Sequence, residues 1–182
     1  MTGPTGRPAA EPVPPPPGAD EPVGHRTDPE VHPAVEVPRP YARETLEAEE
    51  SQIKDGILRM GSLVAERIIA AIVALENHDA DGATWVIEND RDINQLEHEV
   101  SNLITLTIAT QQPVARDLRF LLTLAQVAYD LERMGDYAGS VAKQARKLAP
   151  QPPLKNYVHL PQMGSLAATL VRDILDAVVE ID

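Results

Sequence analysis

Apolar residues recur at helical spacing along three long stretches of the chain. A single apolar face on each stretch predicts amphipathic helices, expected over residues 45–76, 79–110 and 113–148. A run of alternating apolar and polar residues, which would indicate a strand, does not occur. The inner faces are expected to be formed by Ile53, Ile57, Met60, Val64, Ile68, Ala71 and Leu75, then by Val86, Ile93, Leu96, Val100, Leu103 and Ile104, and finally by Leu121, Leu124, Ala128, Leu131, Gly135, Ala138, Ala142 and Ala145.

Short polar connections separate these three stretches. Asp79 is a plausible N-cap for the second helix, and Pro113 suits the first turn of the third. Long helices with short connections pack as antiparallel neighbours. The sequence therefore predicts an all-α fold, an antiparallel three-helix bundle over residues 41–149.

Proline marks the segments outside this bundle. Twelve of the seventeen prolines lie in the first forty residues, where no helical or strand pattern occurs. Residues 1–40 are predicted to be a disordered tail, because they offer too little apolar surface to offset the entropy cost of ordering. Four more prolines lie in residues 150–161, which we interpret as a linker before a fourth helix over residues 162–182.

The fourth helix repeats part of the first. Met60-Gly61-Ser62-Leu63 recurs as Met163-Gly164-Ser165-Leu166, an offset of 103 residues that also aligns Asp79 with Asp182. We interpret residues 162–182 as the first helix of a second, incomplete repeat. An amphipathic helix with Leu166, Leu170, Ile174 and Val178 has no complete core of its own. It must pack on the first bundle or on another subunit, or the natural chain continues, and we expect continuation.

Charge and composition exclude several classes of protein. A net charge of −12 argues against binding to nucleic acid or to an anionic membrane surface. The chain has no cysteine and no apolar run long enough to span a bilayer, which predicts a cytoplasmic protein without membrane insertion. No nucleophile elbow, phosphate-binding glycine loop or zinc-protease helix is present.

Two carboxylates stand out in the third helix. Glu132 falls within the inner-face arc and Asp136, one turn later, lies on its shoulder. Gly135 between them costs about 0.5–1 kcal/mol relative to alanine in a helix, which predicts close approach of a neighbouring helix. A similar pair, Glu88 and Asp92, lies toward the polar side and is interpreted as solvated.

The second helix carries oxygen donors on the matching shoulder, at Asp90, Asn94 and Glu97. Carboxylate and amide oxygens suit iron, manganese, magnesium or calcium, and also accept zinc, so a metal site is one interpretation. The alternative is that these side chains are solvated or paired with an arginine, for which Arg91 and Arg133 are candidates.

Three motifs in register resemble one known family. VIENDRDINQLE (residues 86–97), QQPVARDLR (111–119) and DLERMGDYA (130–138) resemble the PhoU phosphate-signalling proteins, over about residues 43–182. The resemblance implies two tandem three-helix bundles, each with an acidic signature that holds multinuclear iron or zinc in some members. It assigns Glu132, Asp136, Asp90 and Glu97 as metal ligands. Asn94 departs from the aspartate of many members, which weakens the expected site.

The resemblance also implies a function. Family members are negative regulators of the phosphate-starvation response that couple the phosphate ABC transporter ATPase to a phosphate-sensing histidine kinase. They are not known as enzymes, and they commonly form homodimers. Two alternatives come from the residues themselves: a carboxylate-bridged metalloenzyme acting on phosphate esters, and a metal-free helical interaction or storage module.

Overall fold

The computed structural model describes residues 39–152 and 157–180. Three of the predictions above therefore concern residues outside this range. They are the disordered tail, of which residues 1–38 lie outside the described residues, the linker, of which residues 153–156 do, and the alignment of Asp79 with Asp182. The predicted ends of the tail and the linker are wrong, because helices begin at Arg39 and at His159, so residues 39–40 and 159–161 are helical. Pro40 and Pro161 each lie in the first turn of a helix, where proline is tolerated because the backbone N–H has no partner within the helix.

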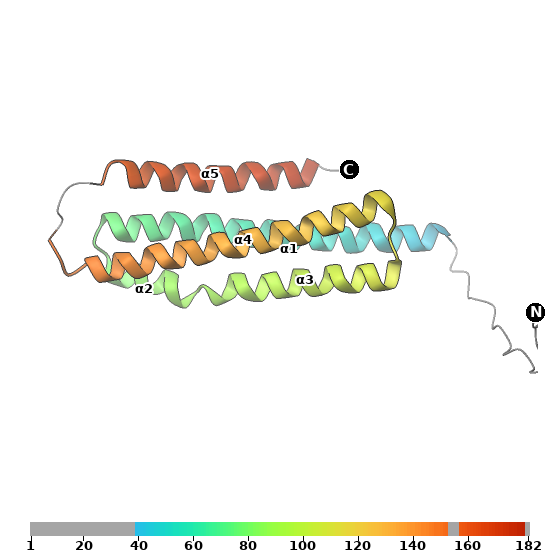
Figure 1. Ribbon diagram of the computed structural model, residues 1–182, viewed down its shortest axis with the longest axis horizontal. Coiled ribbons are helices and arrows are strands. Elements are labelled where there is room, and N and C mark those ends of the chain that lie inside the picture. Colours follow the sequence, from blue (N-terminus) through green and yellow to red (C-terminus); the bar gives the residue numbers. More distant parts are fainter. Residues whose placement is uncertain (1–38, 153–156, 181–182) are drawn as a thin grey trace, which may run out of the picture. The chain divides into compact units, whose positions relative to one another are not determined.

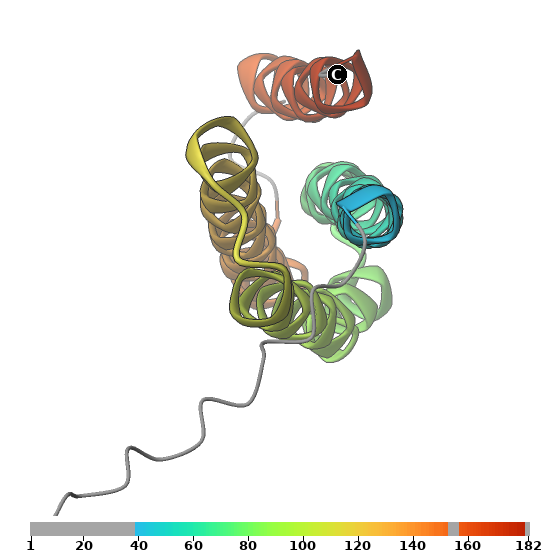
Figure 2. The ribbon, with the colours of Figure 1, turned by 90° about the vertical axis from the view of Figure 1, so that its right-hand side faces the viewer.

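Five helices make up the described part of the chain, which contains no strand. They are α1 (Arg39–Glu76), α2 (Ala80–Glu88), α3 (Arg91–Gln111), α4 (Ala115–Leu148) and α5 (His159–Glu180). Helices α1 and α4 run side by side, and α2 and α3 together form the third rod of the bundle (Figures 1 and 2). The predicted all-α three-helix bundle, followed by one further helix, is confirmed.

The second predicted helix is wrong as a continuous element, because it breaks at Asn89 and Asp90 into α2 and α3. The side-chain amide of Asn89 donates to the carbonyl oxygen of Trp85 at 2.8 Å, an acceptor that its own backbone N–H also uses. Asparagine commonly interrupts helices in this way, because its side chain competes for backbone partners. As a result Asp90 lies at a junction between two helices.

The predicted start of the second helix is confirmed and that of the third is displaced. The carboxylate of Asp79 accepts hydrogen bonds from the backbone N–H groups of Asp81 and Gly82 at 3.0 and 2.9 Å. Helix α4 begins at Ala115, with Val114 as its N-cap, so Pro113 precedes the first turn. Pro113 therefore ends the connection and does not open the helix.

The predicted inner faces form the core. On α4 all eight predicted residues are buried, and on α1 and α2–α3 the exceptions are half-buried: Ile68, Leu75, Leu96 and Leu103. The bulky half of the α4 face packs with isoleucines and valines of α1 and α3. The alanine-rich half, from Ala138 to Ala145, packs with Ala71, Ala74, Ala83 and Val86.

Helix α5 packs against α1 in the opposite direction (Figure 1). A Cβ atom built on Gly61 would lie 2.5 Å from a methyl carbon of Leu175, and one built on Gly164 would lie 2.6 Å from Ile72. The 103-residue offset converts Gly61 and Ile72 into Gly164 and Leu175. The repeated sequence thus forms an antiparallel helix pair with pseudo-twofold symmetry, in which each glycine admits a side chain of the other helix.

The inner face of α5 is formed by small and β-branched residues together with Leu175. Its buried residues are Gly164, Ala168, Val171, Leu175 and Val178. Leu166, Leu170 and Ile174 lie on the opposite face and are 47–62% exposed. Among the described residues, none of the helices has the length and apolar character that a membrane span requires.

Candidate functional site

The predicted carboxylates of α3 and α4 lie close enough to affect one another. Burial raises the pKa of Glu132, and the charges of Asp136, Glu97 and Asp90 raise it further. Burial likewise raises the pKa of Asp90, with Asp136 as the next cause. The bundle therefore brings together Asp90 and Glu97 from one rod and Glu132 and Asp136 from another, which we call the acidic edge.

Two glycines of α4 face the α2–α3 rod, but only Gly135 is needed for its close approach. A Cβ atom built on Gly135 would lie 2.9 Å from the Cδ1 atom of Ile93, so the predicted close approach is confirmed. One built on Gly139 would lie 3.9 Å from the Oδ1 atom of Asp90, an ordinary contact distance. The backbone of α4 thus passes directly against the α2–α3 junction.

Two of the predicted donors, Glu97 and Asn94, differ in their surroundings. Glu97 accepts a hydrogen bond from the Ser101 hydroxyl at 2.6 Å, and its second oxygen lies 3.2 Å from the Nδ1 atom of His98. The Oδ1 atom of Asn94 is buried and has no hydrogen-bond partner in the described part of the chain. An unpartnered buried carbonyl oxygen is costly, and it leaves one acceptor available on this side of the bundle.

The donors fit an oxygen-bound cation by charge and chemistry. Burial, and then the charge of Asp136, raises the pKa values of Asp90 and Glu132, and the Asn94 oxygen has no hydrogen-bond partner among the described residues. However, within residues 39–152 and 157–180 no three or more His, Asp or Glu side chains are gathered into a ready-made metal site. A cation would therefore require side-chain rotation before several oxygens reached it.

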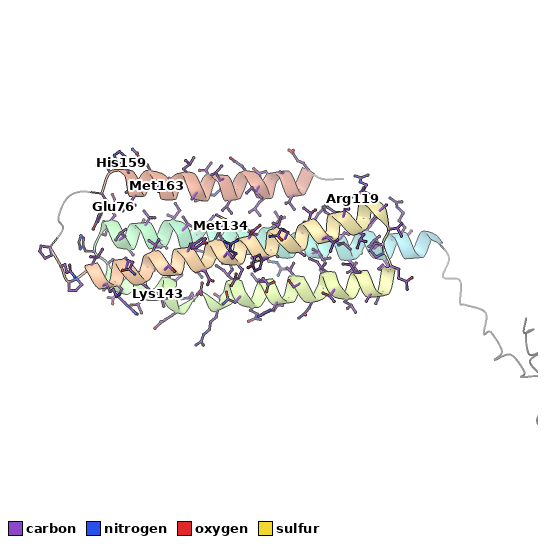
Figure 3. All side chains as sticks on the ribbon, viewed as in Figure 1. Glu76, Arg119, Met134, Lys143, His159 and Met163 are labelled. Carbon is purple, nitrogen blue, oxygen red and sulfur yellow. The ribbon has the colours of Figure 1, made fainter. Side chains whose placement is uncertain are left out.

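A positive charge is already present beside this edge, at Arg67 of α1. Arg67 is only 4% exposed, and its guanidinium carbon lies 4.2 Å from the centre of the Trp85 ring. Its Nη2 atom lies 3.6 Å from a carboxylate oxygen of Asp92, and its charge lowers the pKa of Asp90. Lys143, labelled in Figure 3 on α4, acts on Asp90 in the same direction.

Sequence reasoning proposed different arginines as partners. Arg133 lies 3.5 Å from Asp130 and donates to the Tyr137 hydroxyl, so it acts on Glu132 only through its charge. Arg91 is exposed and makes no hydrogen bond or ion pair with another described residue. The position of Arg67, three residues after Val64 in the inner-face phase of α1, is the signal that identifies it.

The second acidic pair, Glu88 and Asp92, was predicted to be solvated, and this holds fully only for Glu88. Glu88 and Asp92 are both exposed, as their place on the polar side predicts. Asp92 nevertheless provides the carboxylate that Arg67 contacts. Asp92 lies in the first turn of α3, directly after the break that the sequence pattern did not show.

The raised pKa of Glu132 predicts a pH-dependent effect of Glu132→Gln. Because the folded chain holds this proton more tightly than the unfolded chain, the stabilisation is complete below the ordinary value of 4.5 and is lost as pH rises through the folded pKa. Removing the charge should raise the free energy of unfolding at pH 7 by about 0.5 kcal/mol, the size of a like-charge term between helix neighbours. Near pH 3.5 it should change little.

Urea unfolding followed by circular dichroism at both pH values, with chelator present, measures this effect. Glu88→Gln is the matched control, because Glu88 is exposed and outside the acidic edge. A gain at pH 7 that persists unchanged at pH 3.5 would contradict the electrostatic explanation.

Comparison with known proteins gives consistent matches. The family model for the PhoU domain matches residues 57–145. The chain is 34% identical, over 139 residues, to a phosphate-specific transport system accessory protein PhoU homolog from Clostridium acetobutylicum, which covers 76% of this chain and 64% of that protein. The chain thus spans somewhat less than two-thirds of this curated relative.

Two solved structures share the fold. The crystal structure of PhoU from Pseudomonas aeruginosa has a TM-score of 0.71 and 34% identity, covering 75% of this chain and 66% of that one. The phosphate transport system regulatory protein PhoU from Streptococcus pneumoniae has a TM-score of 0.63 and 30% identity, covering 72% and 62%. The relative from Clostridium acetobutylicum is named as an accessory protein and that from Streptococcus pneumoniae as a regulatory protein.

Proposed function

Because the chain belongs to the PhoU family, we propose that it regulates phosphate uptake and acts as a negative regulator of phosphate-starvation signalling in the cytoplasm. The observation that supports this most directly is the match over 139 residues to a relative named for phosphate-specific transport. That match includes the acidic motifs of α3 and α4 as well as the helices that position them. The proposed mode of action is binding through helical surfaces, without catalysis.

Deletion of the gene tests the regulatory role. A phosphate-starvation reporter should become active in high phosphate when the chain is absent, and expression of the chain should silence it again. A reporter that remains silent in the deletion strain would contradict the proposal. Complementation with Glu88→Gln, which lies outside the acidic edge, should restore silencing fully and serves as the control.

The proposed partners are the ATPase of the phosphate ABC transporter, a phosphate-sensing histidine kinase and a second copy of the chain. Exposed apolar side chains on α5, among them Met163 and Leu166, supply area for association that no described helix covers. Co-purification of the tagged chain with the ATPase, and sedimentation of the purified chain, measure these associations directly. Absence of both would contradict this part of the proposal.

We also propose that the acidic edge binds iron or zinc. Glu132, Asp136, Asp90 and Glu97 would hold the metal, with the Asn94 carbonyl oxygen as a neutral ligand. The metal would supply positive charge beside these carboxylates. The raised pKa values of Asp90 and Glu132, which burial and the charge of Asp136 cause, support this part of the proposal. The part played by the chain is to place these oxygens on two adjacent rods of one bundle.

Adding metal should therefore raise the melting temperature of protein from which metal has been removed with a chelator, and Asp136→Asn should reduce this rise. Glu88→Gln, again outside the acidic edge, should leave it unchanged. Elemental analysis of protein purified without chelator provides an independent measurement. No stoichiometric metal, together with no thermal shift, would favour a metal-free interaction module.

A further inference from the structure

A second charged site lies at the end of the bundle where α4 begins. There α1 and α4 border a cleft of about 710 Å³, within the range of about 300–1,000 Å³ typical of small-ligand pockets. Figure 3 labels Arg119 in this region, far along α4 from Lys143 and the acidic edge. The residues that line the cleft are Arg43, Glu47, Glu50, Ser51, Lys54, Arg116, Asp117, Arg119, Phe120 and Thr123.

This cleft gathers four cationic side chains in a chain whose net charge is −12. Arg43 is engaged, because its Nε atom donates to Glu47 at 2.9 Å, and Lys54 lies 5.2 Å from the centre of the Phe120 ring. Arg116 and Arg119 are exposed, and their guanidinium groups make no hydrogen bond or ion pair with any residue in the described ranges. Two guanidinium groups are therefore free to bind an anion.

Helix stability does not explain these two arginines. They occupy the first and second turns of α4, where the aligned peptide dipoles place partial positive charge, so cations there are unfavourable. Both belong to the QQPVARDLR motif, and none of the residues of this motif is part of the acidic edge. An anion bound in the cleft would offset this repulsion.

Glu50 provides the cleft with a hydrogen-bond acceptor. Its Oε1 atom is buried and has no hydrogen-bond partner among the described residues. Burial raises the pKa of this carboxyl, Asp117 raises it further, and Lys54 opposes them; Glu47 and Arg43 have smaller effects. A buried acceptor that lines the same cleft as the guanidinium groups of Arg116 and Arg119 favours an anion that also carries an O–H donor.

We propose that this cleft binds inorganic phosphate in a form that retains a proton. Arg116 and Arg119 donate hydrogen bonds to the phosphate oxygens, for which the planar guanidinium is well suited. The P–OH group donates to the free oxygen of Glu50. Near pH 7.5 hydrogen phosphate still carries this proton, whereas sulfate has none and a phosphate monoester, with a second pKa of about 6, has lost it.

Isothermal titration of the full chain at pH 7.5 tests the proposal, with inorganic phosphate, sulfate and glycerol 3-phosphate at equal ionic strength. Phosphate should bind saturably at one site per chain. Sulfate and glycerol 3-phosphate should bind at least about tenfold more weakly, the factor expected for one lost hydrogen bond to a charged group. Comparing the affinities for inorganic phosphate and glycerol 3-phosphate shows whether the cleft binds free phosphate or a phosphate group carried on a larger molecule.

Variants assign the binding to the cleft. Arg116→Gln combined with Arg119→Gln should weaken phosphate binding by about tenfold or more. Arg146→Gln combined with Lys147→Gln removes the same charge from the exposed last turn of the same helix, and should leave binding unchanged. Glu50→Gln should reduce the preference for phosphate over sulfate, because the amide supplies donors in place of an acceptor. Circular dichroism confirms that each variant is folded.

Three results would overturn the proposal: no saturable binding of phosphate, equal weakening by the Arg146 and Lys147 variant, or equal affinity for phosphate and sulfate. Tighter binding of glycerol 3-phosphate would overturn the assignment to protonated inorganic phosphate. The inference rests on the cleft and not on the regulatory role. Phosphate binding is measured on the purified chain and regulation with the reporter, so either can fail alone.

Discussion

Replacing Gly61 with leucine is expected to release α5 from α1. A Cβ atom at Gly61 would lie 2.5, 2.7 and 2.9 Å from the two methyl carbons and the Cγ atom of Leu175, so no rotamer of the new side chain relieves the overlap. Overpacking of this kind costs about 1–3 kcal/mol or more. Most of the stability of a helix in a protein comes from the packing of its apolar face, so the 22-residue helix α5 should lose much of its structure without its partner.

Limited trypsin digestion measures this release, because Arg172 lies within α5 and becomes a good cleavage site only when the helix unfolds. Gly164→Leu should give the same result, since the pseudo-symmetric contact brings its Cβ atom to 2.6 Å from Ile72. Cleavage at Arg172 as slow as in the unmodified chain would show that α5 does not depend on these glycines.

Alanine at two glycines provides a matched comparison. Gly61→Ala should destabilise the protein, whereas Gly139→Ala should stabilise it by up to about 1 kcal/mol. Both glycines are buried in helices, but the new Cβ atom meets Leu175 at 2.5 Å in one case and Asp90 at 3.9 Å in the other. If the two substitutions change the free energy of unfolding in opposite directions, the effect of Gly61→Ala arises from the α1–α5 contact and not from helix propensity.

Truncation of Arg67 is expected to have the second large effect. Arg67→Ala should lower the free energy of unfolding by about 2–4 kcal/mol, because it leaves a cavity and removes a buried cation from beside carboxylates. The stem of the side chain is buried and its guanidinium covers the Trp85 ring at 4.2 Å. Arg67→Met keeps the volume of the stem and should cost less than half as much.

Urea unfolding measures these differences, and Arg59→Ala is the control on the same helix. Arg59 is exposed and its Nε atom contacts only the carbonyl oxygen of Asp55, at 3.3 Å, so its truncation should have little effect. Equal losses for Arg59→Ala and Arg67→Ala would contradict a specific role for the buried arginine.

Arg67 also affects the interpretation of the acidic edge. A fixed cation beside Asp90 and Asp92 supplies part of the charge that a metal would supply. Protein in which Arg67 is replaced by methionine should therefore bind a divalent cation at least as tightly as the unmodified chain. Weaker binding would indicate that Arg67 holds the ligands in place.

The fold was predictable because helical spacing is a local property. Ile57, Ile93 and Leu121 occupy inner-face positions that depend only on the 3.6-residue period, and all three are fully buried. The N-cap at Asp79 was predictable for the same reason, because it depends on residues two and three positions away. The break at Asn89 was missed because the apolar period continues across it, while the competing hydrogen bond to Trp85 leaves no mark in that period.

The candidate site was predictable only in part. The phase of each helix places Glu132, Asp136, Asp90, Asn94 and Glu97 near a shared edge, and the mutual effects on pKa agree with that placement. Arg67 lies on another helix, so its pairing with Asp92 depends on how the rods pack. The cleft at Arg116 and Glu50 likewise requires α1 and α4 to lie side by side.

The sequence by itself determined the helices, their buried faces, the repeat and the family, because each depends on periodicity or on motifs of adjacent residues. Tertiary structure alone decided what the repeat does: it pairs Gly61 with Leu175 and Gly164 with Ile72 across an antiparallel contact. It also decided which cation lies beside the acidic edge and which arginine side chains have no partner in the described part of the chain. These features depend on distances between residues far apart in the chain, which are set only when helix faces bury one another.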